Sequence, residues 1–183
     1  MKKRVDLPEK KYEGYIFDLD GTLVDSMPLH YRAWREALAR AGAPDHVFRA
    51  DEFYSCGGKS ANDVVRFLNE RYGMHMDAAS TAADKRRIYL EMLEKEGMQP
   101  IREVVEFVHS LGDAPKAIAT GSAMPGASRT LAAAGLSGLF DVILTPDEVE
   151  HGKPAPDMFL KAAELLGVSP DRCVVFEDAE PGM

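Results

Sequence analysis

Short apolar runs alternate with longer amphipathic stretches along much of this chain. Four of the runs are only five or six residues long, and each ends in polar residues. Such brief apolar runs are typical of strands buried on both faces of a parallel sheet. The pattern therefore predicts four parallel strands, at residues 14–19, 116–120, 141–145 and 173–177.

A stretch with helical spacing precedes each of the last three runs. In three stretches apolar residues recur about every three or four positions, and each stretch ends at a glycine, namely Gly112, Gly135 or Gly167. Alternating strands and helices predict an α/β fold, with a Rossmann-like, doubly wound parallel sheet as its core. Ligands of such sheets bind at the carboxyl ends of the strands, so the polar residues that follow each run are candidates for a site.

The stretch between the first run and the rest has a different pattern. It contains no convincing strand, and its apolar residues follow helical spacing, with a capping-box-like start at Ser60 and Asp63. A helical insert after the first strand of an α/β layer is most simply a cap domain. The predicted division is a core of residues 1–26 and 100–183 and a cap of residues 27–99.

Composition and charge narrow the class of protein. The chain has 183 residues and a net charge of −8, which argues against a nucleic-acid partner or an anionic membrane surface. Its two cysteines, Cys56 and Cys173, form neither a disulfide framework nor a four-ligand zinc site. No apolar run approaches the ~20 residues that span a bilayer, and the start lacks a secretory signal. These features predict a cytoplasmic protein with reduced thiols.

Two carboxylates follow the first apolar run directly. Asp18 and Asp20 are two positions apart, with Gly21 and Thr22 next in the sequence. Acids so close repel each other unless a cation or a shared proton relieves the repulsion. The pair therefore indicates metal-assisted nucleophilic or acid–base chemistry.

Three further motifs follow in order, each at a predicted strand end or helix start. With the first they read DLDGT at residues 18–22, IATGS at 118–122, GKPAPD at 152–157 and FED at 176–178. In this order the chain resembles the haloacid dehalogenase superfamily of aspartate-nucleophile phosphotransferases. Within it the chain is similar to the β-phosphoglucomutase-like group with a small helical cap, from about residue 13 to the end.

The resemblance implies roles for the acidic residues. Asp18 matches the nucleophile, which forms an aspartyl-phosphate and so divides hydrolysis into two easier steps. Asp20 matches the general acid and base, and its backbone carbonyl ligates the metal in the family. Asp178 matches a direct Mg²⁺ ligand beside Asp18, and Glu177 is expected to ligate Mg²⁺ itself or through water.

Other motif residues match the phosphate site. Thr120 offers a hydroxyl, and Gly121 and Ser122 offer amides at an expected helix start, where anions bind well. For Ser122 an ordinary helix cap is the alternative. Lys153 is expected to open a helix, where its charge opposes the helix dipole, as suits a residue that must face a phosphoryl group.

Residues of the predicted cap are weaker candidates for substrate contacts. His30 and Lys85 match positions that matter in the mutase, although a packed histidine and a solvated charge run are the alternatives. The mutase pattern has an arginine where this chain has Ala61. Lys59 is a possible substitute, but a lysine lacks the planar fork that suits a second phosphate. This departure favours a phosphatase over a mutase.

The family continues with one more helix and an edge strand, whereas this sequence stops just after its last motif, at Met183. We therefore expect an incomplete carboxyl-terminal part of the core, with an unpaired edge at the fourth strand. The last motif residue, Asp178, would then lie near a frayed terminus.

The sequence predicts a Mg²⁺-dependent phosphatase that acts on a small phosphorylated metabolite, most simply a sugar phosphate, and is a monomer. A hexose-phosphate mutase and an inactive relative are the alternatives. Dehalogenase chemistry is disfavoured because Asp20 and Asp178 would have no use in it.

Overall fold

The computed structural model describes residues 11–57 and 59–178, and these fall into two compact units. The core unit contains the described residues up to Asp25 and from Met98 onward. The helical unit is Ser26–Gly97. Each unit has its own buried apolar cluster.

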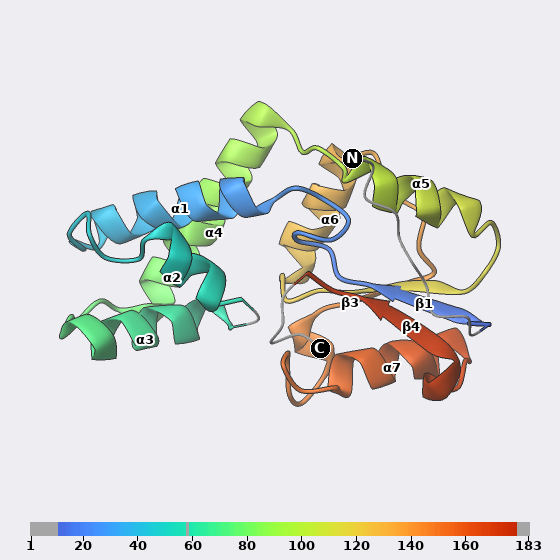
Figure 1. Cartoon of the computed structure of the whole chain (residues 1–183). Coiled ribbons are helices and arrows are strands. Elements are labelled where there is room, and N and C mark those ends of the chain that lie inside the picture. The colour runs from blue at the N-terminus through green and yellow to red at the C-terminus, as the bar shows by residue number, and fades with distance from the viewer. Residues whose placement is uncertain (1–10, 58, 179–183) are drawn as a thin grey trace. The chain divides into compact units, whose positions relative to one another are not determined.

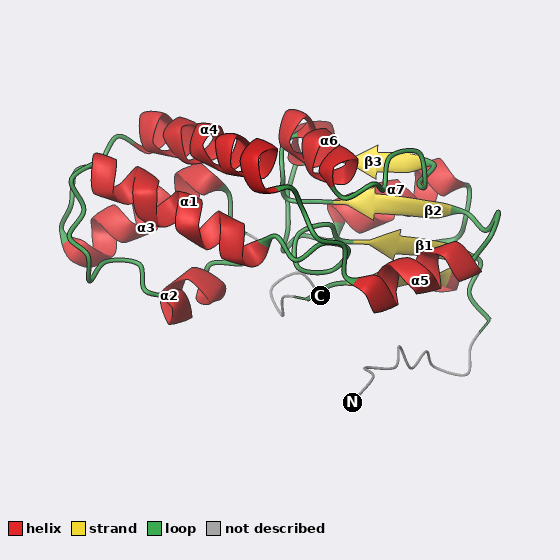
Figure 2. Ribbon diagram, turned by 90° about the horizontal axis from the view of Figure 1, so that it is seen from above, coloured by secondary structure: helices red, strands yellow, loops and turns green. Residues whose placement is uncertain are grey.

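The core unit is built on a four-stranded parallel sheet. Figure 2 shows its strands β1, β2 and β3 side by side. Its strands lie in the order β3-β2-β1-β4, which places the first strand of the chain between the second and the last. Each strand ends one or two residues earlier than the sequence pattern predicts. The strands are β1 (Gly14–Phe17), β2 (Lys116–Ala119), β3 (Val142–Leu144) and β4 (Cys173–Phe176).

Helices cover both faces of this sheet, which confirms the predicted doubly wound α/β fold. The helices α5 (Arg102–Ser110) and α6 (Met124–Ala133) lie on one face, and α7 (Asp157–Leu166) lies on the other (Figure 1). Two single turns of 3₁₀ helix, η1 (Pro146–Glu148) and η2 (Pro170–Arg172), precede and follow α7.

Alternation along β1 explains how the sheet is buried on both faces. Ile16 packs with Met158 and its neighbours in the cluster beneath α7. Phe17 points the other way and stacks on Phe176 of β4, with ring centroids 4.6 Å apart, and both rings approach Phe107 of α5. These aromatic contacts fix β1 and β4, the two strands that carry most of the acidic motif residues, against the same helix.

Two segments of the core unit, residues 23–25 and 99–101, pair where the chain leaves this unit and returns to it. These paired segments are called the neck. Val24 and Pro100 form an antiparallel bridge. The Asp25 amide donates to Gln99 O at 3.0 Å, and the Ile101 amide donates to Leu23 O at 2.8 Å. Backbone hydrogen bonds within the core unit therefore hold together the two segments that flank Ser26–Gly97.

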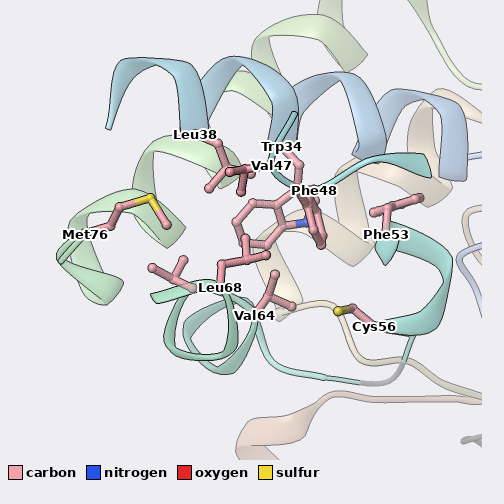
Figure 3. Packing of buried hydrophobic residues seen from close by; sticks show 10 residues of the cluster. Trp34, Leu38, Val47, Phe48, Phe53, Cys56, Val64, Leu68 and Met76 are labelled. Carbon is pink, nitrogen blue, oxygen red and sulfur yellow. The ribbon is translucent and has the colours of Figure 1, made fainter. Parts of the chain in front are cut away.

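The helical unit has four helices, and its described residues contain no strand. Trp34, Phe48 and Leu68 lie in one buried cluster to which three of the helices and the loop before α2 contribute (Figure 3). Ser60 caps the third helix by accepting a hydrogen bond from the Asp63 amide at 3.2 Å, as its sequence predicts. The helices are α1 (Met27–Arg40), α2 (Ala50–Ser55), α3 (Ala61–Tyr72) and α4 (Ala78–Glu96).

Strand β4 lies at one edge of the described sheet. Residues 179–183, which include the sequence end discussed above, lie outside the described residues. Within the described chain no helix has the length and apolarity needed to cross a membrane.

Candidate active site

Three strands of the core unit place polar side chains at the same end of the sheet, where the carboxyl ends of the strands lie. This end is called the acidic edge. Asp18 directly follows β1, Thr120 follows β2, and Glu177 follows β4. Because the strands are parallel neighbours, their carboxyl ends meet, which is where ligands of such sheets bind. The expectation that these residues share one edge is met by the register of the strands.

A buried ion-pair chain forms the centre of this edge. Lys153 Nζ donates to Asp18 Oδ1 at 2.7 Å and to Glu177 Oε2 at 2.6 Å. The side chains of all three residues are less than a tenth exposed. Removing Lys153 would leave two buried carboxylates without their shared cation, which is strongly destabilising.

Lys153 reaches this position from a turn and not from a helix. The expectation that it opens a helix is wrong, because α7 begins at Asp157 and Pro156 is its N-cap residue. The prolines that follow Lys153 are poor helix-interior residues, and they delay the helix by about one turn. The ammonium group is therefore positioned by the turn between η1 and α7.

Burial is the main reason that the pKa of Asp18 rises to about 8. The Lys153 ammonium opposes this rise, while the negative charges of Glu177 and Asp20 add to it. Burial by itself lowers the pKa of Lys153, but Asp18 and Glu177 more than reverse this and raise it above its ordinary value. The lysine alone therefore does not balance the carboxylates around it.

The same edge has a donor set that fits a divalent cation. Oxygen atoms of Asp18, Glu177 and Asp178 all lie within 4.8 Å of one another. Gly21 makes room for one of them: a Cβ at this glycine, whose φ is +96°, would stand 2.3 Å from Asp178 Oδ2. Clustered carboxylate oxygens with excess negative charge are the ligands that Mg²⁺ prefers, so the residues present fit a magnesium ion.

Asp20 is hydrogen-bonded to the second motif. Ser122 Oγ donates to Asp20 Oδ2 at 2.7 Å, across 102 positions of sequence. The Ser122 amide donates to Thr120 Oγ1 at 3.1 Å, and Thr120 is fully buried. The alternative role of Ser122 as a helix cap is wrong, because the N-cap of α6 is Ala123. Gly121 lies between the two residues in the same turn.

The turn after β1 is held by its backbone. The Gly21 amide donates to Val24 O at 2.9 Å, and the Val24 amide donates to Leu19 O at 3.1 Å. The Thr22 hydroxyl is buried and has no hydrogen-bond partner among the described residues. The turn that presents Asp20 therefore does not depend on a hydrogen bond from the Thr22 side chain.

The cap candidates lie in the helical unit. Lys85 Nζ is 2.8 Å from His30 Nδ1, and the His30 ring stacks on Tyr89 with centroids 4.0 Å apart. Lys85 also lies over the Trp34 ring, 5.6 Å from its centroid, so it is not a solvated member of a charge run. Lys59 is exposed, just before α3.

The Ser122–Asp20 and Lys153–Glu177 contacts were missed by sequence reasoning, although all four residues were candidates. The motifs indicate which residues gather at the sheet edge. The motifs do not indicate which side chains form hydrogen bonds with each other. These partners are far apart in the sequence, and the order of the strands in the sheet brings them together.

Comparison with known proteins agrees with this geometry. A family model described as haloacid dehalogenase-like hydrolase matches residues 12–183. The chain is 36% identical over 175 residues to fructose-1-phosphate phosphatase YqaB of Escherichia coli K12, covering 95% of this chain and 90% of that protein. It is also 36% identical over 175 residues to hexitol phosphatase A of the same organism, covering 93% and 76%.

A solved structure is similar over nearly the same length. CbbY from Rhodobacter sphaeroides, determined in complex with phosphate, matches with a TM-score of 0.80 at 26% identity and covers 93% of this chain and 80% of that one. Family match, relatives and fold agree with the four sequence motifs. The chain is therefore an enzyme that belongs to the haloacid dehalogenase-like hydrolases.

Proposed function

We propose that this hydrolase is a Mg²⁺-dependent phosphatase that cleaves the ester of a small phosphorylated metabolite, most simply a sugar phosphate. The observation that carries the proposal is the buried contact of Asp18 with Lys153 beside Asp20. A carboxylate nucleophile, a cation for phosphoryl oxygens and a second carboxyl group for the proton are the parts that such a reaction needs.

In the first step Asp18 attacks the phosphorus atom of the substrate. The bond from its carboxylate oxygen to phosphorus forms while the ester bond to the leaving oxygen breaks, and Asp20 gives that oxygen its proton. Lys153 and the Thr120 hydroxyl hold the phosphoryl oxygens, together with the backbone amide of Gly121 in the turn that follows Thr120. The products of this step are the free alcohol and an aspartyl-phosphate.

In the second step water attacks the phosphorus atom of the aspartyl-phosphate. Asp20, now ionised, takes the proton of that water, and the bond between phosphorus and Asp18 breaks. Mg²⁺, held by Asp18, Asp178 and the Asp20 carbonyl with Glu177 beside them, would supply positive charge that keeps Asp18 ionised and neutralises phosphate. Inorganic phosphate leaves and Asp18 is restored.

We assign the choice of substrate to the helical unit, acting as a cap. His30 and Lys85 form a polar and aromatic group with Tyr89 and Trp34 that suits the hydroxyls and ring of a sugar. Lys59 adds an exposed positive charge before α3. The relatives named fructose-1-phosphate phosphatase and hexitol phosphatase make phosphorylated ketoses and hexitols the first substrates to examine.

The test is phosphate release from fructose 1-phosphate and from hexitol phosphates, with Mg²⁺ and with a chelator. We expect turnover with Mg²⁺, loss of turnover with the chelator, and a fall of at least ~1,000-fold in Asp18→Asn with an unchanged circular dichroism spectrum. Asp113→Asn, an exposed acid in a turn away from the site, is the matched control. Near-normal turnover of Asp18→Asn would refute the mechanism.

The same assay separates the proposal from mutase chemistry. β-Glucose 1-phosphate is followed for both inorganic phosphate and isomeric hexose phosphate. Isomer formation without phosphate release would identify a mutase and overturn the assignment as a phosphatase.

A further inference from the structure

Ser122 forms hydrogen bonds with both Asp20, the proposed proton-transfer group, and Thr120, the proposed phosphate-binding threonine of the core unit. Its hydroxyl donates to Asp20 Oδ2 at 2.7 Å, and its amide donates to Thr120 Oγ1 at 3.1 Å. The first contact uses the side chain and the second uses the backbone. A substitution of the side chain therefore removes the first contact and keeps the second.

The two partners differ in how firmly the fold holds them. Thr120 is fully buried at the end of β2, and the turn that follows continues into α6. Asp20 is only partly buried and lies in the turn after β1. A side chain in such a turn has rotamer freedom that a second group must restrict if its carboxyl is to stay in one place.

Ser122 is well placed to impose that restriction. Strands β1 and β2 pair directly, with Phe17 opposite Ile118, so the turns that follow them are neighbours. The turn of Ser122 is anchored at both ends, by β2 before it and by α6 after it. A hydroxyl fixed in this way holds one oxygen of the Asp20 carboxyl by a hydrogen bond at 2.7 Å.

We propose that Ser122 is a positioning residue: its hydroxyl orients the Asp20 carboxyl for proton transfer to the leaving oxygen, and it does not serve chiefly to bind phosphate. This inference rests on the function proposed above. It gives Ser122 a task different from the phosphate contact expected from its motif. It also makes the second motif act on both the phosphoryl group and the proton.

The consequence depends on the leaving group. A sugar alkoxide is a poor leaving group and needs the proton of Asp20 as the ester bond breaks, whereas p-nitrophenolate leaves without protonation. Loss of orientation at Asp20 should therefore slow the sugar phosphate and largely spare the aryl phosphate. A loss of phosphate binding would slow both substrates alike.

The experiment compares kcat/KM for fructose 1-phosphate and for p-nitrophenyl phosphate, because this ratio reports the step in which the leaving group departs. We expect Ser122→Ala to lose about 10- to 100-fold on the sugar phosphate, part of the 10²–10⁴ that a general acid contributes. On the aryl phosphate the loss should stay below about threefold. Asp20→Ala should give the same pattern with a larger loss.

Two further variants complete the design. Ser122→Thr keeps the hydroxyl and should restore most of the sugar-phosphate rate, which a purely structural role would not predict. Ser128→Ala, in α6 with an exposed hydroxyl, is the matched control and should equal the wild type on both substrates. If Ser122→Ala unfolds, Ser122→Cys, whose thiol is a weak donor, takes its place.

Equal losses on both substrates, or no loss on either, would overturn the assignment of Ser122. These outcomes differ from a failure of the proposed function, which would appear as a wild-type enzyme that releases phosphate from neither substrate with Mg²⁺. In that case the role of Ser122 falls together with the function on which it rests.

Discussion

At the scale of single residues, Gly21 shows how a missing side chain shapes the acidic edge. Its φ of +96° suits glycine, and the Asp178 carboxylate occupies the space where a Cβ would stand. A methyl group at this position would have to displace a carboxylate that we propose as a metal ligand. Sequence patterns explain this glycine by the conformation of the turn. They do not reveal that a side chain here would collide with the Asp178 carboxylate.

We expect Gly21→Ala to weaken Mg²⁺ binding by roughly 10- to 100-fold, the range seen when groups that orient metal ligands are changed. Titration calorimetry with MgCl₂ measures this directly. Gly138→Ala is the matched control, because Gly138 also has a positive φ, of +80°, but nothing lies within 4 Å of its added Cβ. Equal Mg²⁺ affinities in the two variants would contradict the proposed role of the space beside Gly21.

Asp18 gives a prediction for the metal-free protein. Its pKa in the folded state, about 8, lies above its ordinary value of 3.8, so folding favours the protonated form. The resulting stabilisation is complete below about pH 4 and is lost as the pH rises through 8.

The melting temperature of the chelator-treated protein should therefore fall between pH 4 and pH 8, and Asp18→Asn should flatten this fall. Saturating Mg²⁺ should also reduce the dependence, because a nearby cation favours the ionised carboxylate. A flat profile in the chelated wild type would contradict the raised pKa.

At the scale of elements, helix α3 has a clear sequence signal at each end. Ser60 begins α3 through its side chain, and Gly73 ends it in a left-handed conformation. The short helix α2 has six residues and too few apolar positions to establish a period, which is why the sequence pattern did not indicate it. Its position is set by packing of Phe53 in the buried cluster of the helical unit.

The cap of α3 provides a test at this scale. Ser60→Ala removes the acceptor for the Asp63 amide and should lower the free energy of unfolding by about 1 kcal/mol, as measured in urea. Ser60→Thr, which keeps an acceptor, should lose less than half of this. A loss of equal size in both variants would indicate that crowding and not capping explains the effect.

The sequence was enough to predict which residues lie together in the candidate site. It was not enough to predict which side chains form hydrogen bonds with each other. Asp18, Thr120 and Glu177 could be placed together because parallel strands share their carboxyl ends. The bond of Lys153 to Glu177 depends on the route of a proline-containing turn before α7, and no local pattern specifies that route. The bond of Ser122 to Asp20 depends on the pairing of β1 with β2, which is a property of the whole sheet.

At the scale of the whole molecule, two separate apolar clusters support two different tasks. The acidic edge, with every proposed catalytic residue, belongs to the core unit, whereas Phe48 and Trp34 belong to the cluster of the helical unit. Substitutions far apart and without shared partners act independently on stability. Stability of the helical unit and metal binding by the core unit should therefore respond separately to mutation.

Phe48→Ala tests this separation, because Phe48 is fully buried in the helical unit. We expect it to lower the free energy of unfolding by about 3–5 kcal/mol, as for other large-to-small core substitutions. The Mg²⁺ affinity measured by calorimetry on the folded variant should equal that of the wild type. A parallel loss of affinity would show that the two clusters are coupled.

The neck formed by Val24 and Pro100 has a further consequence for engineering. Because backbone bonds already join the segments on either side, Ser26–Gly97 is in effect a long loop whose two ends meet. The entropy of closing a loop grows only slowly with its length, so the core tolerates an insert of almost any size there. Because Asp25 pairs with Gln99, a two-residue Asn-Gly turn should be able to replace residues 26–98, so the neck is a suitable site for exchanging one insert for another.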